Sequence, residues 1–375
     1  MQPITEFIQS PAGRQFLESN GVYIDRPTFE AQLHLPLEPD LAADLGQPGK
    51  KLVCSGQQIY VDYRQSVLSK VEILRDMAGR SDLFGFFLWV DTDRSGSDNL
   101  ITKFAWPNFS KKGPITIMPS RTREVEARFA EIEDERLASA IDKLETYLRQ
   151  YAKPHKGAKE RFMQLRSIFM GENHHTLGEF NLRLTNFLLE QVYDYVPPAR
   201  LLSQMLGQPA ILAEIEQFVN ALPEARQVFN ETIETVAGHG LDPQLSPLDE
   251  HYLPLFFSCQ ADDQRLRLYR YSENGDHFAG GRCRCGQTYK FHLGQRRLSL
   301  AEIAQTGRWS PDVCFPIYFN DRVSGFVAGK SSGIYLMVLG AVMRRVLGKS
   351  PVPVLLPTRL AAAEPDSLLY KYMTQ

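Results

Sequence analysis

The chain has 375 residues, of which 43% are hydrophobic and 23% are charged, with a formal net charge of −2 and a pI of about 6.5. This is a globular composition with length for two or three structural units, and its charge balance does not favour a nucleic-acid partner. No apolar run approaches the ~20 residues of a membrane helix, the N-terminus lacks the pattern of a signal peptide, and five scattered cysteines do not indicate a disulfide framework. We therefore expect a cytoplasmic protein with no membrane partner.

The N-terminal part of the chain predicts the first half of an open α/β sheet. Residues 1–50 contain scattered Pro, Gly and Asp and predict a mostly irregular lead-in with one short helix. "KLVCS" (51–55) predicts a strand, and "SGQQ" (55–58) predicts a turn that leaves it. A helical pattern containing Val67, Val71, Leu74 and Met77 follows.

The next apolar run, "LFGFFLWVD" (83–91), predicts a buried strand, and "PITIMP" (114–119) predicts a further one. Strand, helix and buried strand make a βαβ unit. Because its strands are apolar without interruption, we expect helices on both faces of the sheet.

A helical insertion follows. Apolar residues recur at helical spacing from residue 125 to residue 151, which predicts one long amphipathic helix. Another helix is predicted near 162–170, and "TLGE" (176–179) has the spacing of a capping box at the start of a third. Further helical patterns run to about residue 235.

The sheet pattern then returns. "YLPLFF", "LRLYRY" and "YKFHLG" predict antiparallel strands, "VCFPIYFND" (313–321) a buried strand, residues 332–348 a helix and "VPVLLP" (352–357) a last strand. Together the patterns predict an α/β fold with a Rossmann-like nucleotide-binding core. Its halves, residues 1–120 and 301–375, are split by a helical insertion (121–245) and a small antiparallel Cys-containing β segment (246–300).

Candidate ligand-binding residues follow the predicted strands, at the edge where open α/β sheets hold their ligands. Gly56, Gln57 and Gln58 could bind a ligand through a close backbone and two neutral amides, although an ordinary solvated turn has the same composition. Asp91 and Asp93 could bind a metal, a ribose or an amine, and Asp-Gly-Ser loops are also common as solvated turns.

Two further clusters lie in the second half. Asn320 and Asp321 follow the predicted strand 313–319. Gly329, Lys330, Ser331 and Ser332 precede a predicted helix, whose free N–H groups could bind a phosphate with help from the lysine. The spacing of a P-loop is absent, so a helix capped by one of the serines explains the same residues.

Three cysteines of the antiparallel segment, Cys259, Cys283 and Cys285, could be ligands of a zinc ion. The first of the two knuckles has a single cysteine, with Asp262, Asp263 or His277 as substitutes. We expect a knuckle without metal, and bound zinc is the alternative. Cys54 and Cys314 lie in apolar runs and are interpreted as core residues.

The order of these landmarks resembles the bacillithiol biosynthesis cysteine-adding enzymes (the BshC family). The similarity is carried by Gly56-Gln57-Gln58, by Ser69-Lys70, by "FFLWVDTDRSGSD", by "TLGEFNLRLTNFLL" and "ETVAGHGLDPQLSP", and by the segments 299–329 and 349–359. The family has a histidine in its acidic loop, where this chain has Arg94 nearby. The resemblance spans residues 50–360.

The resemblance implies a ligase that joins an amino acid, cysteine in that family, to the amine of a small-molecule acceptor, with ATP or ADP bound. Asp91, Asp93 and Lys330 would be catalytic. Gly56, Gln57, Gln58, Asn320 and Asp321 would bind substrate, and the Gly329–Ser332 loop would bind the nucleotide. We expect these clusters to converge on one cleft.

Two other interpretations stay open. One is a non-catalytic descendant of the fold that binds a nucleotide or a partner. The other is a nucleic-acid or protein docking module made by the Cys-containing segment and the helical insertion. It is suggested by the arginines of the segment (Arg265, Arg267, Arg270, Arg282, Arg284, Arg296 and Arg297), which in antiparallel strands can equally be an ordinary solvated face. The oligomeric state is also open, and a homodimer is one alternative.

Overall fold

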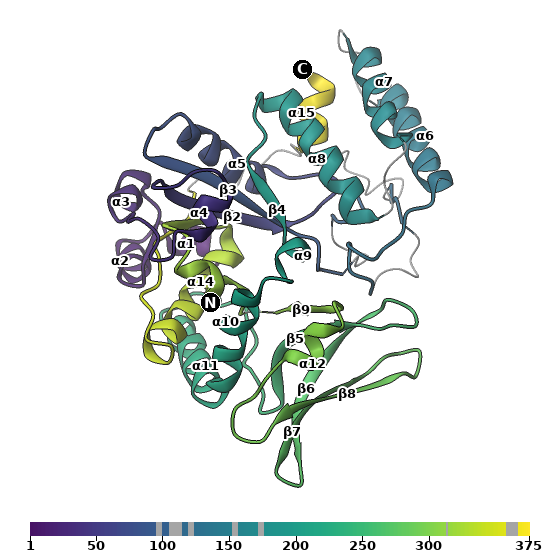
Figure 1. Cartoon of the computed structure of the whole chain (residues 1–375). Coiled ribbons are helices and arrows are strands. Elements are labelled where there is room, and N and C mark those ends of the chain that lie inside the picture. Colours follow the sequence, from purple (N-terminus) through teal and green to yellow (C-terminus); the bar gives the residue numbers. More distant parts are fainter. Residues whose placement is uncertain are drawn as a thin grey trace.

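The computed structural model describes residues 1–94, 100–104, 115–118, 124–151, 157–171, 176–312, 314–357 and 367–375. Its main sheet is parallel throughout, with the strand order β1-β11-β10-β2-β3-β4 (Figure 1). The strands are β1 (Val22–Tyr23), β2 (Lys51–Gln58), β3 (Leu83–Val90), β4 (Ala199–Leu201), β10 (Gly325–Val327) and β11 (Val354–Leu355).

A second, antiparallel sheet has the order β8-β7-β6-β5-β9 and forms a separate layer in Figure 1. Its strands are β5 (Tyr252–Ser258), β6 (Arg265–Glu273), β7 (Asp276–Arg282), β8 (Thr288–Gly294) and β9 (Trp309–Pro311).

The described helices are α1 (Ile4–Phe7), α2 (Pro11–Ser19), α3 (Arg26–Ala31), α4 (Asp40–Asp44), α5 (Gln65–Ala78), α6 (Asp134–Tyr151), α7 (Ala158–Phe169), α8 (Leu177–Tyr193), α9 (Leu202–Met205), α10 (Pro209–Asn220), α11 (Leu222–Gly238), α12 (Ala301–Gln305), α13 (Phe315–Asn320), α14 (Lys330–Arg345) and α15 (Leu368–Thr374). None of the helices in these described ranges combines the length and the apolar sequence needed to cross a bilayer.

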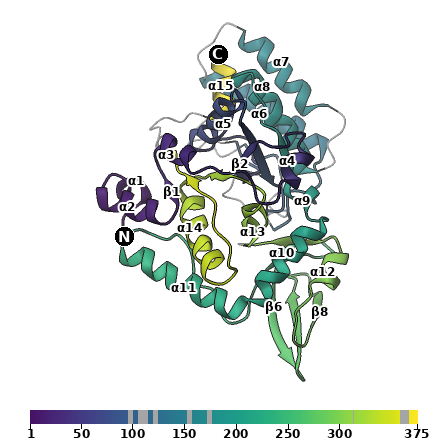
Figure 2. The same ribbon diagram turned by 60° about the vertical axis from the view of Figure 1, so that its left-hand side comes forward.

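Both faces of the parallel sheet are covered, as the uninterrupted apolar strands predict. On β2, Leu52 and Cys54 belong to one buried cluster, shared with α10, α11 and α14. Val53, between them, belongs to a second cluster, shared with α5, α8 and α15. Because successive strand residues point to opposite faces, the alternation assigns one core to each face. Figure 2 shows α14 and α11 together on one side of the sheet. The predicted α/β, Rossmann-like architecture is confirmed.

The strand order places a topological switch point between β2 and β10. From β2 the chain continues outward to β3 and β4, whereas β10 begins the other half of the sheet, next to β11. The connections leave these two neighbours in opposite directions, which opens a crevice at their carboxyl ends.

The N-terminal fifty residues are more ordered than the sequence predicts. They form four short helices and the edge strand β1, which pairs with β11. Phe29 of α3 is fully buried, so this segment completes the sheet and covers part of it.

The insertion is also less purely helical than expected. Its strand β4 pairs with β3 at the edge of the main sheet. The predicted long helix begins only at Asp134, because residues 124–131 instead form turns and single bridges to neighbouring segments. Residues 121–123, at the start of the predicted helical insertion, lie outside the described residues. Of the predicted strand 114–119, the described part contains one isolated bridge, between Thr116 and Lys103.

The predicted strand 313–321 is wrong: residues 315–320 are the helix α13. Five of its six residues are buried, so apolar residues occur all around the helix. A short continuous apolar run has the same pattern in a buried helix as in a buried strand. The strand of this half is β10, which is only three residues long and therefore too short to give a strand pattern.

The contact between the N-terminal segment and β10 can be tested at Gly325. A Cβ atom at Gly325 would lie 2.7 Å from Leu33 Cδ2 and 2.9 Å from Phe29 Cζ, both in buried side chains. We expect Gly325→Ala to lower the free energy of unfolding by about 1–3 kcal/mol through overpacking, measured by urea denaturation. Gly207→Ala, at an exposed glycine with open space around it, is the control and should change stability by less than about 0.5 kcal/mol. Equal stability of the two variants would contradict this packing.

Candidate functional site

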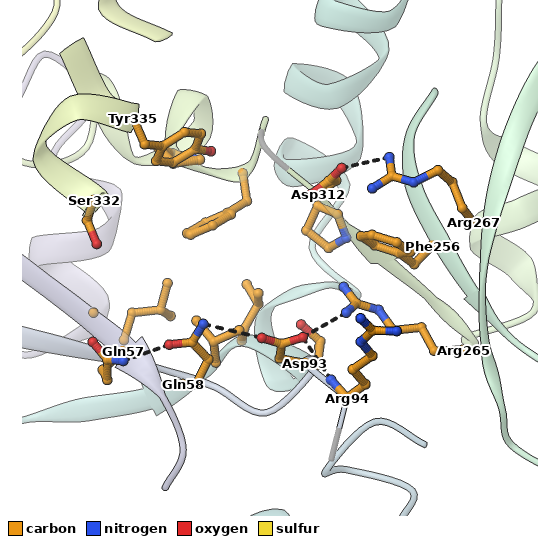
Figure 3. A pocket seen from close by; sticks show the side chains of 18 of the residues that line it. Gln57, Gln58, Asp93, Arg94, Phe256, Arg265, Arg267, Asp312, Ser332 and Tyr335 are labelled. Atoms are coloured by element: carbon orange, nitrogen blue, oxygen red, sulfur yellow. Dashed lines mark hydrogen bonds and ion pairs between the residues drawn. The ribbon is translucent and has the colours of Figure 1, made fainter. Parts of the chain in front are cut away.

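A cleft of about 920 Å³ lies at the switch point, between the carboxyl ends of β2, β3 and β10 and one face of the antiparallel sheet. One wall is formed by the ends of β2 and β3, another by β6 and the β7–β8 turn, and a third by α13 and the start of α14 (Figure 3). Its labelled polar side chains face a common space: Gln57, Gln58, Asp93, Arg94, Arg265, Arg267, Asp312, Ser332 and Tyr335.

The first wall is a line of hydrogen bonds that starts at Lys70 of α5. Lys70 Nζ donates to the carbonyl of Gly56 at 2.7 Å and to Gln57 Oε1 at 2.9 Å. Gln57 Nε2 donates to Gln58 Oε1 at 2.7 Å, and Gln58 Nε2 donates to Asp93 Oδ2 at 3.3 Å. The line therefore joins a buried ammonium group to a carboxylate through two amides.

The carboxylate at one end fixes the direction of both amides. Because a carboxylate only accepts, Gln58 turns its nitrogen to Asp93 and its oxygen to Gln57 Nε2. This leaves the oxygen of Gln57 to accept from Lys70. Tyr60 supports the arrangement by donating to Gln58 Oε1 at 3.2 Å. The amides are thus presented to the cleft in one orientation.

Lys70 is a residue of the cleft wall to which the sequence analysis gave no role, although Ser69-Lys70 is among the landmarks of the resemblance. Its side chain is 1% exposed, and burial lowers its pKa to about 7. A signal was available: Lys70 lies between Val67, Val71 and Leu74 on the apolar face of α5, where a charge is unusual.

The second wall is basic. Arg265 and Arg267 alternate with buried Leu266 and Leu268 along β6, so both arginines face the cleft. Both guanidinium groups lie over the ring of Phe256, at 3.6 Å and 4.5 Å from its centroid.

Each of these arginines is also held by a carboxylate. Arg265 Nη1 bonds to Asp93 Oδ1 at 2.8 Å, and Arg267 Nη1 bonds to Asp312 Oδ2 at 2.8 Å. The arginines are thereby fixed in position while they remain on the wall of the cleft.

The described lining residues carry an excess of positive charge. They include five arginines (Arg94, Arg265, Arg267, Arg282 and Arg284) against three carboxylates (Asp93, Glu124 and Asp312). Arg282 and Arg284 are exposed at the end of β7 and in the turn that follows. Such a wall suits a ligand with carboxylate or phosphate groups. Four arginines of the antiparallel segment (Arg265, Arg267, Arg282 and Arg284) therefore line the cleft. From the sequence alone, an ordinary solvated face of the sheet was an equally good explanation of these residues.

The third wall combines apolar side chains with a helix N-terminus. Phe315, Phe319 and Phe326 line it, together with Tyr335 and Leu336 of α14. α14 begins directly after β10, and its N-cap, Gly329, has no side chain to occupy the first N–H groups. Ser332 of this first turn lines the cleft.

The structure brings part of the predicted site together. Gly56, Gln57, Gln58, Asp93 and Ser332 all line the cleft. The strand β2 continues through Gln58, so the predicted turn at 55–58 is wrong, and Gly56 pairs in register with Leu88.

Other predicted residues lie elsewhere. Asp91 is 1% exposed and accepts hydrogen bonds from the backbone N–H and the hydroxyl of Ser203, so it caps the first turn of α9. Burial raises the pKa of Asp91. Gly329, Lys330 and Ser331 are adjacent to the cleft but are not among its lining residues, and Ser331 donates to Gln244.

Asn320 and Asp321 are outside the cleft because they end a helix and follow no strand. Asn320 binds the backbone of Ser350 and Val352, and Asp321 pairs with Lys349 at 2.5 Å. Their contacts tie α13 to the segment before β11.

Among the described residues, two groups of side chains have the composition of a metal site. Glu38, Glu214 and Asp321 lie close together, but their carboxylates are already paired with Arg322 and Lys349. Cys259, Asp262, Cys283 and Cys285 gather at the end of the cleft, and Cys283 is among its lining residues.

Compared with models of known protein families and with curated proteins, the chain matches none.

The lowered pKa of Lys70 predicts a specific pH dependence of stability. Between about pH 7 and pH 10.5 the unfolded chain binds a proton at Lys70 that the folded chain lacks, so this residue makes stability rise with pH. Lys70→Met removes that contribution. We expect the stability of wild type relative to Lys70→Met to increase by roughly 3 kcal/mol between pH 7 and pH 9.5 in urea unfolding. Lys143→Met, at an exposed lysine of α6, is the control. Parallel pH profiles for wild type and Lys70→Met would show that the lysine is not buried as described.

Proposed function

We propose that the cleft binds a small molecule that carries carboxylate or phosphate groups and an amine, and that the chain joins an amino acid, cysteine in the simplest case, to that amine. The observation that carries the proposal is the pairing of two oriented neutral amides with an arginine wall across one cleft. The choice of ligation as the chemistry rests on the order of sequence landmarks that resembles the cysteine-adding family.

The two walls suit different parts of such a substrate. Arg267 and the exposed Arg282 can bind a carboxylate or phosphate by charge-assisted hydrogen bonds. Gln57 and Gln58 can bind hydroxyl groups, which both donate and accept, without imposing a charge. An amine held between the walls would face Asp93, whose carboxylate contacts Gln58 on one wall and Arg265 on the other.

Formation of the C–N bond needs an activated carboxyl group and an amine that has lost its proton. A nucleoside triphosphate would supply the activation, and the first turn of α14, beside Ser332, is the best available place for its phosphates. When the amine attacks the activated carboxyl carbon, the C–N bond forms and the activating phosphate or nucleoside monophosphate leaves. The amine's proton can pass to Asp93, the cleft carboxylate that also bonds to Gln58 and Arg265. The five free cysteines suit the reducing cytoplasm as the place of action.

A specific observation favours a second candidate, a non-catalytic binder. Of the three residues expected to be catalytic, Asp91 is buried in a cap and Lys330 is not among the lining residues. Only Asp93 lines the cleft, and an arginine already neutralises it. A chain that retained the cleft and lost the reaction would have this arrangement.

An assay of amide formation separates the two candidates. The chain is incubated with ATP, cysteine and anionic amines such as glucosaminyl malate and glucosamine 6-phosphate, and the product is detected by mass spectrometry. Arg267→Gln should reduce the rate at subsaturating acceptor at least tenfold, since a lost charge-assisted bond costs more than about 1.4 kcal/mol. Arg270→Gln, on the same strand but outside the cleft lining, is the matched control and should stay within about twofold.

Three results are informative. An amide product that depends on Arg267 supports the ligase. Binding of the anionic amine that depends on Arg267, without product, supports the non-catalytic binder. The absence of both binding and product would contradict the proposed function.

Nucleotide binding is tested separately by thermal unfolding. A ligand that binds only the folded chain adds ~2.7 kcal/mol of stability at a hundredfold excess over its Kd, so millimolar ATP or ADP should raise the Tm measurably. Ser332 lines the cleft, so Ser332→Leu should reduce this rise in Tm because the larger side chain would fill the space for the phosphates. Ser331→Leu, at a residue outside the lining, should leave the rise unchanged. An unchanged Tm at millimolar nucleotide would remove the nucleotide from the proposal.

A further inference from the structure

Four potential metal ligands meet where two turns of the antiparallel sheet come together. The first turn joins β5 to β6 and contains Cys259 and Asp262. The second joins β7 to β8 and contains Cys283 and Cys285. The ligand atoms of all four residues lie within 4.8 Å of one another. Each turn thus contributes two ligands, and no other described residue is required to complete a set of four.

The distances match those of a tetrahedral thiolate site. Cys259 Sγ and Cys285 Sγ are 3.6 Å apart, and Cys283 Sγ lies 3.4 Å and 3.7 Å from the two carboxylate oxygens of Asp262. Four ligands around Zn²⁺, with Zn–S near 2.3 Å and Zn–O near 2.1 Å, place two sulfurs about 3.8 Å apart and a sulfur and an oxygen about 3.6 Å apart. The sulfur separation is also far longer than the ~2.05 Å of a disulfide.

The backbone of both turns is shaped to bring the ligands back toward each other. In each turn, the residue after the last ligand is left-handed: Asp263 has φ 57° and Gly286 has φ 99°. A left-handed conformation is uncommon for a residue other than glycine, so contacts with neighbouring residues must stabilise it at Asp263. Arg308 provides them: its guanidinium group donates to the carbonyl of Cys259 at 2.8 Å and to the carboxylate of Asp263.

Cys259 Sγ is surrounded by donors. The hydroxyl of Tyr289 lies at 3.1 Å and the backbone N–H of Ala261 at 3.4 Å. N–H and O–H donors directed at a sulfur hold it in one orientation, as they do around the ligands of metal sites. Tyr289 in turn accepts from the backbone N–H of Gln260 at 2.8 Å, so it is held in place.

We propose that Cys259, Asp262, Cys283 and Cys285 bind one structural Zn²⁺, which joins the β5–β6 turn to the β7–β8 turn. Three sulfurs and one carboxylate favour zinc over Mg²⁺ or Ca²⁺, which prefer sets of oxygen ligands. The set is closed by four protein ligands, as in structural zinc sites, with no position left for a substrate. From the sequence we expected a knuckle without metal and named Asp262, Asp263 and His277 as substitutes for a missing cysteine. Of these three residues, Asp262 lies beside the three sulfurs.

The ion would also fix the basic wall of the cleft. Arg282 and Arg284 flank Cys283, and Arg265 follows Asp262 by three residues. Binding at the four ligands therefore limits the positions of these arginines, which line the cleft. The zinc site stands on its own geometry and does not depend on the proposed reaction.

The test is the metal content of the chain, purified without chelator and with any affinity tag removed. We expect one equivalent of zinc in wild type by inductively coupled plasma mass spectrometry. Cys285→Ser, at the exposed ligand, and Asp262→Asn should each lower the zinc content at least several-fold after dialysis against a weak chelator. Asp262→Cys completes a four-cysteine site and should retain the full equivalent. Cys314→Ala, at a buried cysteine outside the cluster, is the control and should retain zinc.

Substitution by Co²⁺ gives a readout that does not depend on folding yield. Wild type and Asp262→Cys should show the thiolate-to-cobalt charge-transfer band and the intense visible bands of tetrahedral Co²⁺. Folded wild type without zinc after growth in zinc-supplemented medium would overturn the proposal. So would iron in place of zinc, a Cys259–Cys285 disulfide in the native chain, or zinc that Cys285→Ser and Asp262→Asn leave unchanged.

Discussion

The site depends on one buried ammonium group. Lys70 reaches the end of β2 from α5 and has two acceptors there, the carbonyl of Gly56 and the amide oxygen of Gln57. Burial of a charge is unfavourable unless hydrogen bonds replace the lost water. Lys70 therefore holds the end of β2 and starts the amide line that leads to Asp93. The same contacts that satisfy the lysine orient the polar groups that face the cleft.

Asp93 connects the end of β2 to the antiparallel sheet, because it bonds to Gln58 and to Arg265 of β6. Its second oxygen binds Arg265, whose Nε lies 3.4 Å from the fully buried Glu126, and Glu126 also pairs with Arg128 at 2.7 Å. Removing one partner of a buried ion pair lowers the stability of a protein by about 3–5 kcal/mol, because the other charge is left buried and unpaired. The ion pairs thus fix how the arginine wall faces the parallel sheet. The cleft is consequently a product of both sheets, and neither sheet forms it alone.

The sequence predicted the parts of the fold that have strong periodicity. The buried strand at 83–91, the helices α5, α8 and α14, and the sheet covered on both faces all follow from apolar spacing. Short elements gave less information. α13 is apolar on every side and has the pattern of a strand, and β10 is only three residues long. Residues 124–131 were expected to be helical, but their side chains are used in tertiary contacts, including the ion pairs of Glu126. Gln57, Gln58 and Asp93 were identified because they end strands at a ligand-binding edge. Arg265 and Arg267 could not be distinguished from a solvated face, since only the packing of one sheet against the other shows which face they occupy.

The most direct test of the central claim is a crystal structure of the chain grown with saturating glucosaminyl malate, an anionic amine that also carries hydroxyl groups. We expect this compound in the cleft, with a carboxylate at Arg267 or Arg282 and a hydroxyl at Gln57 or Gln58, while the contacts from Lys70 through Gln57 and Gln58 to Asp93 stay in place. A cleft without the compound in crystals where Arg267 and the two glutamines are accessible, or glutamine side chains turned away from Lys70 and Asp93, would contradict this expectation.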